Sequence, residues 1–211
     1  MDFPMRVLLL SFLFTALSLS SICYGRNIET WDMDEQGAWV LDKENSTVSF
    51  DVDFLVFSKV KGKVNEFEAK LGFVDNDISS SQLDVVIAAS SIDTENKERN
   101  ADIHSEEFFD VLQYPHIYFT VDEIQSLKRE KYVTKVLVTL KGVTRQADFF
   151  LEYKGIELDP QTGQEKAKLK LYGKLDRLEY GMRLSSFLEA GGIFLGKMIY
   201  VDCTLEFLRA E

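Results

Sequence analysis

From residue 47 onward, the chain alternates apolar and polar residues with a period of two. In the first such stretch, Val48, Phe50 and Val52 alternate with Ser49 and Asp51. A period of two places every second side chain on the same face of a β-strand. The same alternation recurs in three further stretches: 117–122, 166–174 and 199–207. The pattern predicts strands that each have one dry face and one solvated face.

Turn residues separate these stretches at the distances expected of hairpins. Val74–Asp77, Gly142 and Asp159–Gly163 place Gly, Asn, Asp and Pro between the apolar runs. Counting the runs gives about eight or nine candidate strands. No repeat, low-complexity tract or linker interrupts them, and we therefore expect a single domain.

One stretch departs from the period of two. Glu95–Phe109 is highly charged and contains neither Gly nor Pro. We interpret it as a helix or a pair of short turns, with Thr94 as the residue that caps its start. A second short helix is expected at Leu184–Leu188, ahead of the loop that contains Gly191 and Gly192.

Antiparallel strands with one dry face pack either as a sandwich or as a closed barrel. An eight-stranded barrel leaves an interior just wide enough for side chains or for one small ligand. The 16 Phe and 8 Tyr of the chain suit either interior, so composition leaves both open. A membrane-spanning barrel is disfavoured, because charges such as Asp51, Lys168 and Glu206 would have to line a narrow lumen, and because Arg209–Glu211 is not an apolar aromatic strand end.

Residues 1–25 have the tripartite pattern of a secretory signal peptide. Arg6 precedes the apolar run Val7–Leu19, and small and polar residues follow up to Gly25. We expect cleavage after Gly25, which leaves residues 26–211 as one mature domain. A retained membrane anchor is the alternative, but the run is short for about 30 Å of hydrocarbon.

Cysteine usage fits export to a bacterial periplasm. Cleavage removes Cys23 and leaves Cys203 alone, so the mature chain can form no intramolecular disulfide. Small secreted scaffolds usually depend on disulfides, whereas a domain of this size can rely on its core. Cys203 lies on the apolar side of its alternating stretch, and we expect a buried core residue there.

The charge balance excludes some partners. The formal net charge is −11, which repels the phosphate backbone of nucleic acids and does not favour an anionic membrane surface. After residue 25 no apolar run is long enough to cross a bilayer as a helix. We expect a soluble protein that binds neither nucleic acid nor, stably, a membrane.

Catalytic and metal-binding patterns are weak. His104 and His116 have no second metal ligand at a characteristic spacing, and there is no phosphate-binding loop, nucleophile elbow or Cys–His pair. We therefore predict no catalytic residue, metal or cofactor. One alternative stays open: a hydrolase that uses two carboxylates of the acidic cluster between Asp93 and Glu107, which also includes Asp102 and Glu106.

Seven short motifs follow one another between Trp39 and Phe207. They are Trp39–Asp42 with Asn45–Phe50; Val60–Lys63 with Asn65–Phe67; Ala89–Thr94 with Asn96 and Arg99; Ser105 with Phe108–Asp110 and Tyr114–Phe119; Leu140–Arg145; Arg177 with Tyr180–Gly181; and Glu189–Gly192. In this order they resemble the YceI family of bacterial lipocalin-like proteins. The resemblance implies an all-β fold, a lipocalin-like antiparallel barrel of about eight strands with one or two short helices.

The resemblance also implies a function: a periplasmic barrel that encloses a polyisoprenoid, an isoprenoid quinone or a similar long amphiphile. On that basis we select eight inward positions as candidate ligand contacts, for each of which plain core packing is the alternative. They are Phe50, Val52, Phe54, Phe67, Phe119, Leu169, Leu171 and Val201. Arg99 and Arg177 are candidate head-group contacts, although together with Asp93 and Asn96 they also suit a structural role.

Some questions stay open at this stage. Where the family often has a Lys-His pair, this chain has Asp53-Phe54, which leaves its head-group preference undecided. A solid barrel that serves as an interaction module, without a ligand, is a second alternative to the carrier. A homodimer through exposed strand edges is compatible with the pattern.

Overall fold

The computed structural model describes residues 39–55, 58–74, 77–160, 162–183 and 195–210. Its strands are β1 (Trp39–Leu41), β2 (Thr47–Phe54), β3 (Ser58–Val64), β4 (Phe67–Val74), β5 (Asp77–Ala88), β6 (Ile92–Asp93), β7 (His116–Lys128), β8 (Lys131–Leu140), β9 (Val143–Leu158), β10 (Glu165–Asp176) and β11 (Leu195–Arg209). Its helices are α1 (Lys97–His104) and the short 3₁₀ turns η2 (Ala89–Ser91) and η3 (Arg177–Tyr180).

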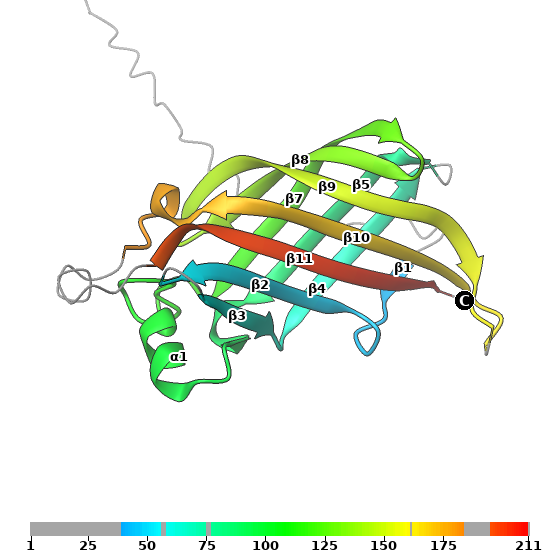
Figure 1. The fold of residues 1–211 in the computed structure, drawn as a ribbon. Helices are drawn as coiled ribbons and strands as arrows, with labels where there is room; N and C mark the ends of the chain where they lie inside the picture. Colours follow the sequence, from blue (N-terminus) through cyan, green and yellow to red (C-terminus); the bar gives the residue numbers. More distant parts are fainter. Residues whose placement is uncertain (1–38, 56–57, 75–76, 161, 184–194, 211) are drawn as a thin grey trace, which may run out of the picture. The chain divides into compact units, whose positions relative to one another are not determined.

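Eight strands close into a ring in the order β1-β4-β5-β7-β8-β9-β10-β11, because β11 also pairs with β1 (Figure 1). All of the pairings are antiparallel. The remaining strands continue from β11 as β2, β3 and β6. The prediction of an all-β antiparallel barrel of about eight strands is confirmed.

The ring has two different ends because β11 has two partners on the same side. Its last residues, from Phe207 onward, pair with β1, whereas Leu195 to Thr204 pair with β2. The chain passes from β1 to β2 through a short loop, and from β3 to β4 through Asn65 and Glu66. As a result, β1 and β4 complete the wall at one end, and β2 and β3 form the wall at the other.

Alternation along the strands produces the core. In the β10–β11 ladder, Leu171 lies opposite Cys203 and Leu169 opposite Leu205, and all four side chains are buried. Burial raises the pKa of the Cys203 thiol to about 12, as befits a core residue. The prediction that Cys203 is buried is confirmed.

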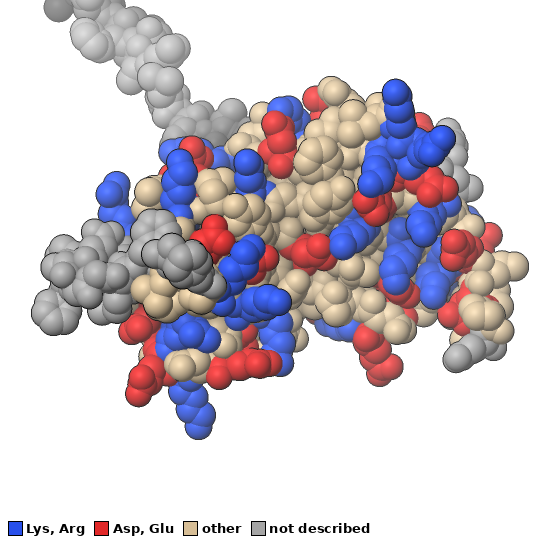
Figure 2. Space-filling model, viewed as in Figure 1, with Lys and Arg blue, Asp and Glu red and all other residues tan. Residues whose placement is uncertain are grey.

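The outward positions of the same strands carry paired charges. Glu206 is 7% exposed at its side chain, with Lys168 Nζ 2.5 Å and Lys166 Nζ 3.3 Å from its carboxylate oxygens. Lys170 of β10 forms an ion pair with Asp202, its diagonal neighbour on β11. Figure 2 shows acidic and basic side chains interleaved over this face of the barrel.

Aromatic side chains fill the interior of the barrel. Phe149 lies over Gly173 of the neighbouring strand and meets Phe119 edge-on, with 6.2 Å between ring centroids and 81° between planes. Phe149, Leu151 and Phe207 are fully buried. Phe119 and Phe149 come from β7 and β9, the two neighbours of β8, and their rings occupy space that an open barrel would leave to a ligand.

The charged stretch after β6 forms helix α1, but the predicted cap is wrong. Asn96 is the N-cap, and its side-chain oxygen accepts a hydrogen bond from the backbone N–H of Arg99 at 2.9 Å. Thr94 lies outside the helix, where its hydroxyl and N–H both donate to Asn100. Asn is at least as good an N-cap residue as Thr, and the helix begins two residues later than the prediction placed it. The second predicted helix, Leu184–Leu188, lies outside the described residues.

No helix within the described ranges is long and apolar enough to cross a membrane.

Replacing Gly173 with Ala should test the packing of the interior. A Cβ atom there would lie 2.6 Å from the Phe149 ring, so the ring must shift. We expect Gly173→Ala to lower the free energy of unfolding by about 1–3 kcal/mol, measured by denaturant titration. The control is Lys174→Ala, at the exposed next position, with a change within about 0.5 kcal/mol. Equal effects of the two substitutions would contradict the packing described.

Candidate ligand-binding cavity

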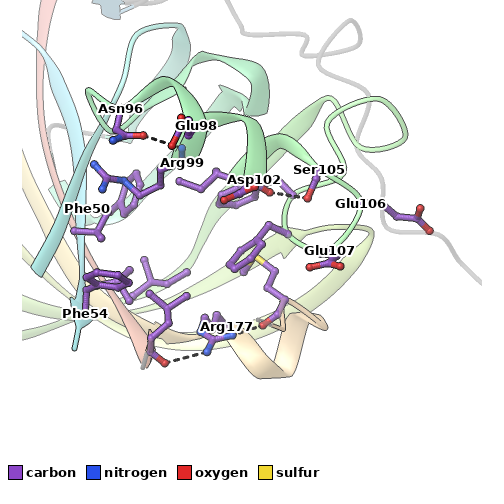
Figure 3. A pocket seen from close by; sticks show the side chains of 18 residues that line it. Phe50, Phe54, Asn96, Glu98, Arg99, Asp102, Ser105, Glu106, Glu107 and Arg177 are labelled. Carbon is purple, nitrogen blue, oxygen red and sulfur yellow. Dashed lines mark hydrogen bonds between the residues drawn. The ribbon is translucent and has the colours of Figure 1, made fainter. Parts of the chain in front are cut away.

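A cavity of about 690 Å³ opens beside the ring, at the end where β2 and β3 form the wall (Figure 3). Its volume lies within the range of small-molecule binding sites, about 300–1,000 Å³. The lining residues come from β2, β3, α1, the turns that follow α1, the turn after η3, and the start of β11. They are Phe50, Val52, Phe54, Val60, Asn96, Glu98, Arg99, Asp102, Ile103, Ser105, Glu106, Glu107, Phe108, Phe109, Arg177, Met182, Leu195 and Ile199.

The strands supply the apolar wall. Phe50, Val52 and Phe54 lie two residues apart on β2 and therefore share one face. Val60 of β3 is directly opposite Val52, and so is Ile199 of β11 on the other side. Three neighbouring strands thus present one continuous apolar surface to the cavity.

Phe50 owes its position to a glycine. Gly62 lies opposite Phe50 in the β2–β3 pair, and a Cβ atom on Gly62 would come within 2.3 Å of the phenyl ring. The ring therefore rests directly on the β3 backbone. Any larger residue at position 62 would displace it towards the cavity.

A much smaller hollow of about 50 Å³ lies deeper in the barrel, among residues that include Phe119, Leu140 and Val201. Phe50 and Ile199 line both spaces, as does Phe109. These three side chains separate the cavity from the hollow. The rest of the interior is the packed core around Phe149 described above.

The helix side of the cavity is polar and acidic at its rim. Glu98 and Asp102 come from α1, and Glu106 and Glu107 come from the turns after it. All four are exposed, and carboxylates are negatively charged at neutral pH. The cavity therefore has an apolar interior and a polar, negatively charged rim.

The two arginines at the cavity both bind main-chain or hydroxyl oxygens of the protein. Arg99 donates from Nε to the Thr94 hydroxyl at 2.9 Å and from Nη2 to the Thr94 carbonyl at 2.7 Å. This ties α1 to the end of β6.

Arg177 is only 5% exposed and donates to three carbonyls from two parts of the chain. Nη1 donates to Met182 at 2.6 Å, Nε to Gly196 at 2.9 Å and Nη2 to Leu195 at 3.0 Å (Figure 3). The guanidinium thereby fixes the turn after η3 to the start of β11. Both segments line the cavity, so Arg177 sets the shape of this wall.

The acidic cluster is divided between the cavity rim and positions outside the lining. Asp93 is outside the cavity lining, and hydrogen bonds from the Asn100 amide and the Glu95 N–H lower the pKa of its carboxyl. A general acid requires a shift in the opposite direction. The carboxylates that do reach the rim are exposed.

The histidines take structural or surface positions. His104 Nε2 lies 3.0 Å from the Ile92 carbonyl, which ties the end of α1 to β6. His116 is exposed beside Tyr118, with 6.2 Å between ring centroids. Among the residues that the structure describes, no group of three or more His, Cys, Asp or Glu side chains is arranged to hold a metal ion.

The structure divides the predicted contact residues into three groups. Phe50, Val52 and Phe54 line the cavity, as do Arg99 and Arg177. Phe119 and Val201 line the smaller hollow. The other three pack in or against the core, away from both spaces: Phe67, Leu169 and Leu171.

Sequence reasoning missed the part of the cavity that is not built from strands. Ile103, Phe108 and Phe109 are half-buried and face the cavity from the charged stretch. The available signal was these three apolar residues among charged neighbours, which is the composition of a segment that covers an apolar surface. Met182 and Leu195 also line the cavity.

An antiparallel barrel with an apolar cavity and a polar rim defines a class of small-molecule-binding proteins. The chain belongs to the family of YceI-like domains, whose model matches residues 39–207. A UPF0312 protein of Staphylococcus epidermidis is 32% identical over 166 residues, which cover 79% of this chain and 94% of that protein. A UPF0312 protein of Staphylococcus aureus is 30% identical over 173 residues, covering 82% and 98%.

Solved structures share the fold. The Campylobacter jejuni YceI protein superposes with a TM-score of 0.63 at 25% identity, covering 74% of this chain and 89% of its own. BcnA of Burkholderia cenocepacia gives 0.68 at 16% identity, covering 79% and 98%. A polyisoprenoid-binding domain from Saccharophagus degradans gives 0.63 at 13% identity, covering 83% and 100%.

Replacing Arg177 with Gln should destabilise the protein, because three buried carbonyls lose a charged donor. We expect the free energy of unfolding to fall by about 2–4 kcal/mol. Arg177→Lys should recover only part of the loss, since an ammonium group lacks the planar fork of donors. The control is Arg145→Gln, because Arg145 is exposed. If Arg177→Gln lowers the free energy of unfolding no more than the control does, Arg177 does not hold the two segments together as described.

Proposed function

We propose that the protein binds the apolar chain of an isoprenoid or similar amphiphile in the cavity beside the ring, and leaves the head group at the acidic rim. The observation that carries the proposal is the cavity itself, about 690 Å³ with apolar walls from β2, β3 and β11. The similarity to a polyisoprenoid-binding domain supports the choice of ligand. Membership of the YceI-like family supports binding as the activity.

The cavity volume limits how much ligand is enclosed. At about 30 Å³ per non-hydrogen atom, the space of one water molecule in the liquid, the cavity holds about 20 such atoms. This corresponds to roughly three or four isoprene units. A longer chain would extend past the rim, or would have to displace Phe50 and Phe109 to enter the hollow behind them.

Burial of such a chain supplies enough free energy for useful affinity. Each buried CH₂ group contributes about 0.8 kcal/mol, so three isoprene units contribute about 12 kcal/mol. Association and ordering remove about 4–15 kcal/mol. The balance is compatible with a dissociation constant in the micromolar range, and a carrier that must release its ligand needs no tighter binding.

Binding without catalysis is part of the proposal. The rim carboxylates are exposed, and Asp93 is held ionised by its hydrogen bonds. An interaction module with a filled interior is the competing function. The packed core around Phe149 favours it, but the cavity is a feature that such a module does not need.

Native mass spectrometry of the purified protein should show a lipid-sized adduct that is lost on denaturation.

Ile103 of α1 lines the cavity and is half-buried, so Ile103→Gln places an amide against the ligand without altering the barrel. We expect this variant to bind farnesol about tenfold more weakly, as measured by calorimetry.

The matched control is Leu112→Gln, because Leu112 is 97% exposed and lies outside the cavity. It should bind farnesol as the unmodified protein does. An empty protein that also fails to bind added farnesol would favour the interaction module.

We further propose that the protein acts in the periplasm after removal of residues 1–25. The support is the pattern of the sequence, with a basic residue, an apolar run and small residues in that order. We expect the protein in the periplasmic fraction to begin at Arg26, as read by intact mass. Leu10→Arg should interrupt the apolar run and leave uncleaved protein in the cytoplasm. Full-length protein in the periplasmic fraction would contradict cleavage.

A further inference from the structure

We infer that the cavity selects amphiphiles whose head group is neutral or positively charged, and that it discriminates against phosphate and carboxylate head groups. This rests on the proposed function, because it concerns the same cavity. It goes further in naming the class of head group, which the departure at Asp53-Phe54 left undecided.

The acidic residues at the rim are the first observation. Glu98, Asp102, Glu106 and Glu107 all line the opening, and all are exposed. Figure 3 shows Asp102 and Glu107 at the cavity, whereas Glu106 points away from it. A head group left at the opening by a buried chain would therefore lie among carboxylates.

The arginines of the lining are the second observation. Phosphate is usually bound by a guanidinium group that directs its fork of donors at the anion. Here Arg177 directs Nε, Nη1 and Nη2 at three carbonyls, and Arg99 directs Nε and Nη2 at Thr94. To bind an anion instead, each would have to give up hydrogen bonds that hold the wall of the cavity.

The nearby lysines do not change this balance. The Lys141 ammonium group donates a hydrogen bond to the Glu106 carbonyl, and Lys59 forms an ion pair with Asp51 on the outer face of β2. Neither is among the residues that line the cavity. Among the described residues, the charged groups at the lining are thus four carboxylates and two arginines that already have protein partners.

The effect of the rim should be moderate and sensitive to salt. Exposed charges a few ångströms apart interact through a high effective dielectric, and a few such pairs change affinity by about tenfold. At 1 M salt the screening length falls to about 3 Å, so most of the discrimination should disappear.

The test compares three probes that share one apolar chain: farnesol, farnesylamine and farnesyl phosphate. With delipidated protein at low salt, we expect farnesyl phosphate to bind about tenfold more weakly than farnesol, and farnesylamine to bind at least as tightly as farnesol. Calorimetry at low and high salt measures all three.

Two variants assign the effect to the rim. Glu98→Gln, Asp102→Asn and Glu107→Gln together remove three negative charges at the cavity and should bring farnesyl phosphate close to farnesol. The control variant combines Glu44→Gln, Glu130→Gln and Glu157→Gln, three exposed carboxylates outside the lining. It changes the net charge equally and should leave the discrimination intact.

The outcomes separate the two proposals. If farnesyl phosphate binds as tightly as farnesol or more tightly, the inference is overturned and the proposed function stands. The same conclusion follows if the control variant abolishes the discrimination as fully as the rim variant does. If none of the three probes binds, the proposed function fails, and the inference fails with it.

Discussion

Strand β11 determines the form of this protein, because it pairs with β10 along nearly its whole length but divides its other edge between two strands. Its last residues close the ring through β1, and its earlier residues pair with β2. A sheet that closes has no free edge and must fill its interior, whereas a sheet that continues outwards through β2, β3 and β6 can leave space beside it. The division of one strand edge thus produces a packed end and an open end.

The two ends differ in how their inward side chains are used. At the end closed by β1, Phe207 lies opposite Leu41 on one side and Ala167 on the other, and its side chain is fully buried. At the open end, Phe50 rests on Gly62 and lines the cavity together with Phe109. Arg177 then holds the start of β11 and the turn after η3 together as one wall.

This arrangement explains which parts of the structure the sequence could predict. The period of two identified the strands and their inward faces, because alternation is a local property of each strand. Phe50 and Leu169 follow the same local pattern, yet one lines the cavity and the other is core. The difference depends on what lies across the barrel, which no single stretch of sequence encodes.

The stretch after β6 was harder to interpret for a related reason. Its charges predicted a solvated helix, and α1 is indeed exposed on most of its surface. The role of its few apolar residues, Ile103, Phe108 and Phe109, as part of the cavity lining is evident only once the position of β2 and β3 is known. The predicted cap, Thr94, instead bonds to Arg99 and Asn100 of the helix, while Asn96 caps it.

The position of the acidic residues at the cavity rim changes their interpretation. Carboxylates close together suggest catalysis when only the sequence is considered, and a glycosidase-like pair would include one general acid with a raised pKa. At the rim they are exposed, while the buried surface of the same cavity is apolar. Separation of the charged groups from the apolar interior is the arrangement that an amphiphile requires, with its chain inside and its head at the water. In the proposed function, the acidic residues influence which head group is accepted, through their charge at the opening.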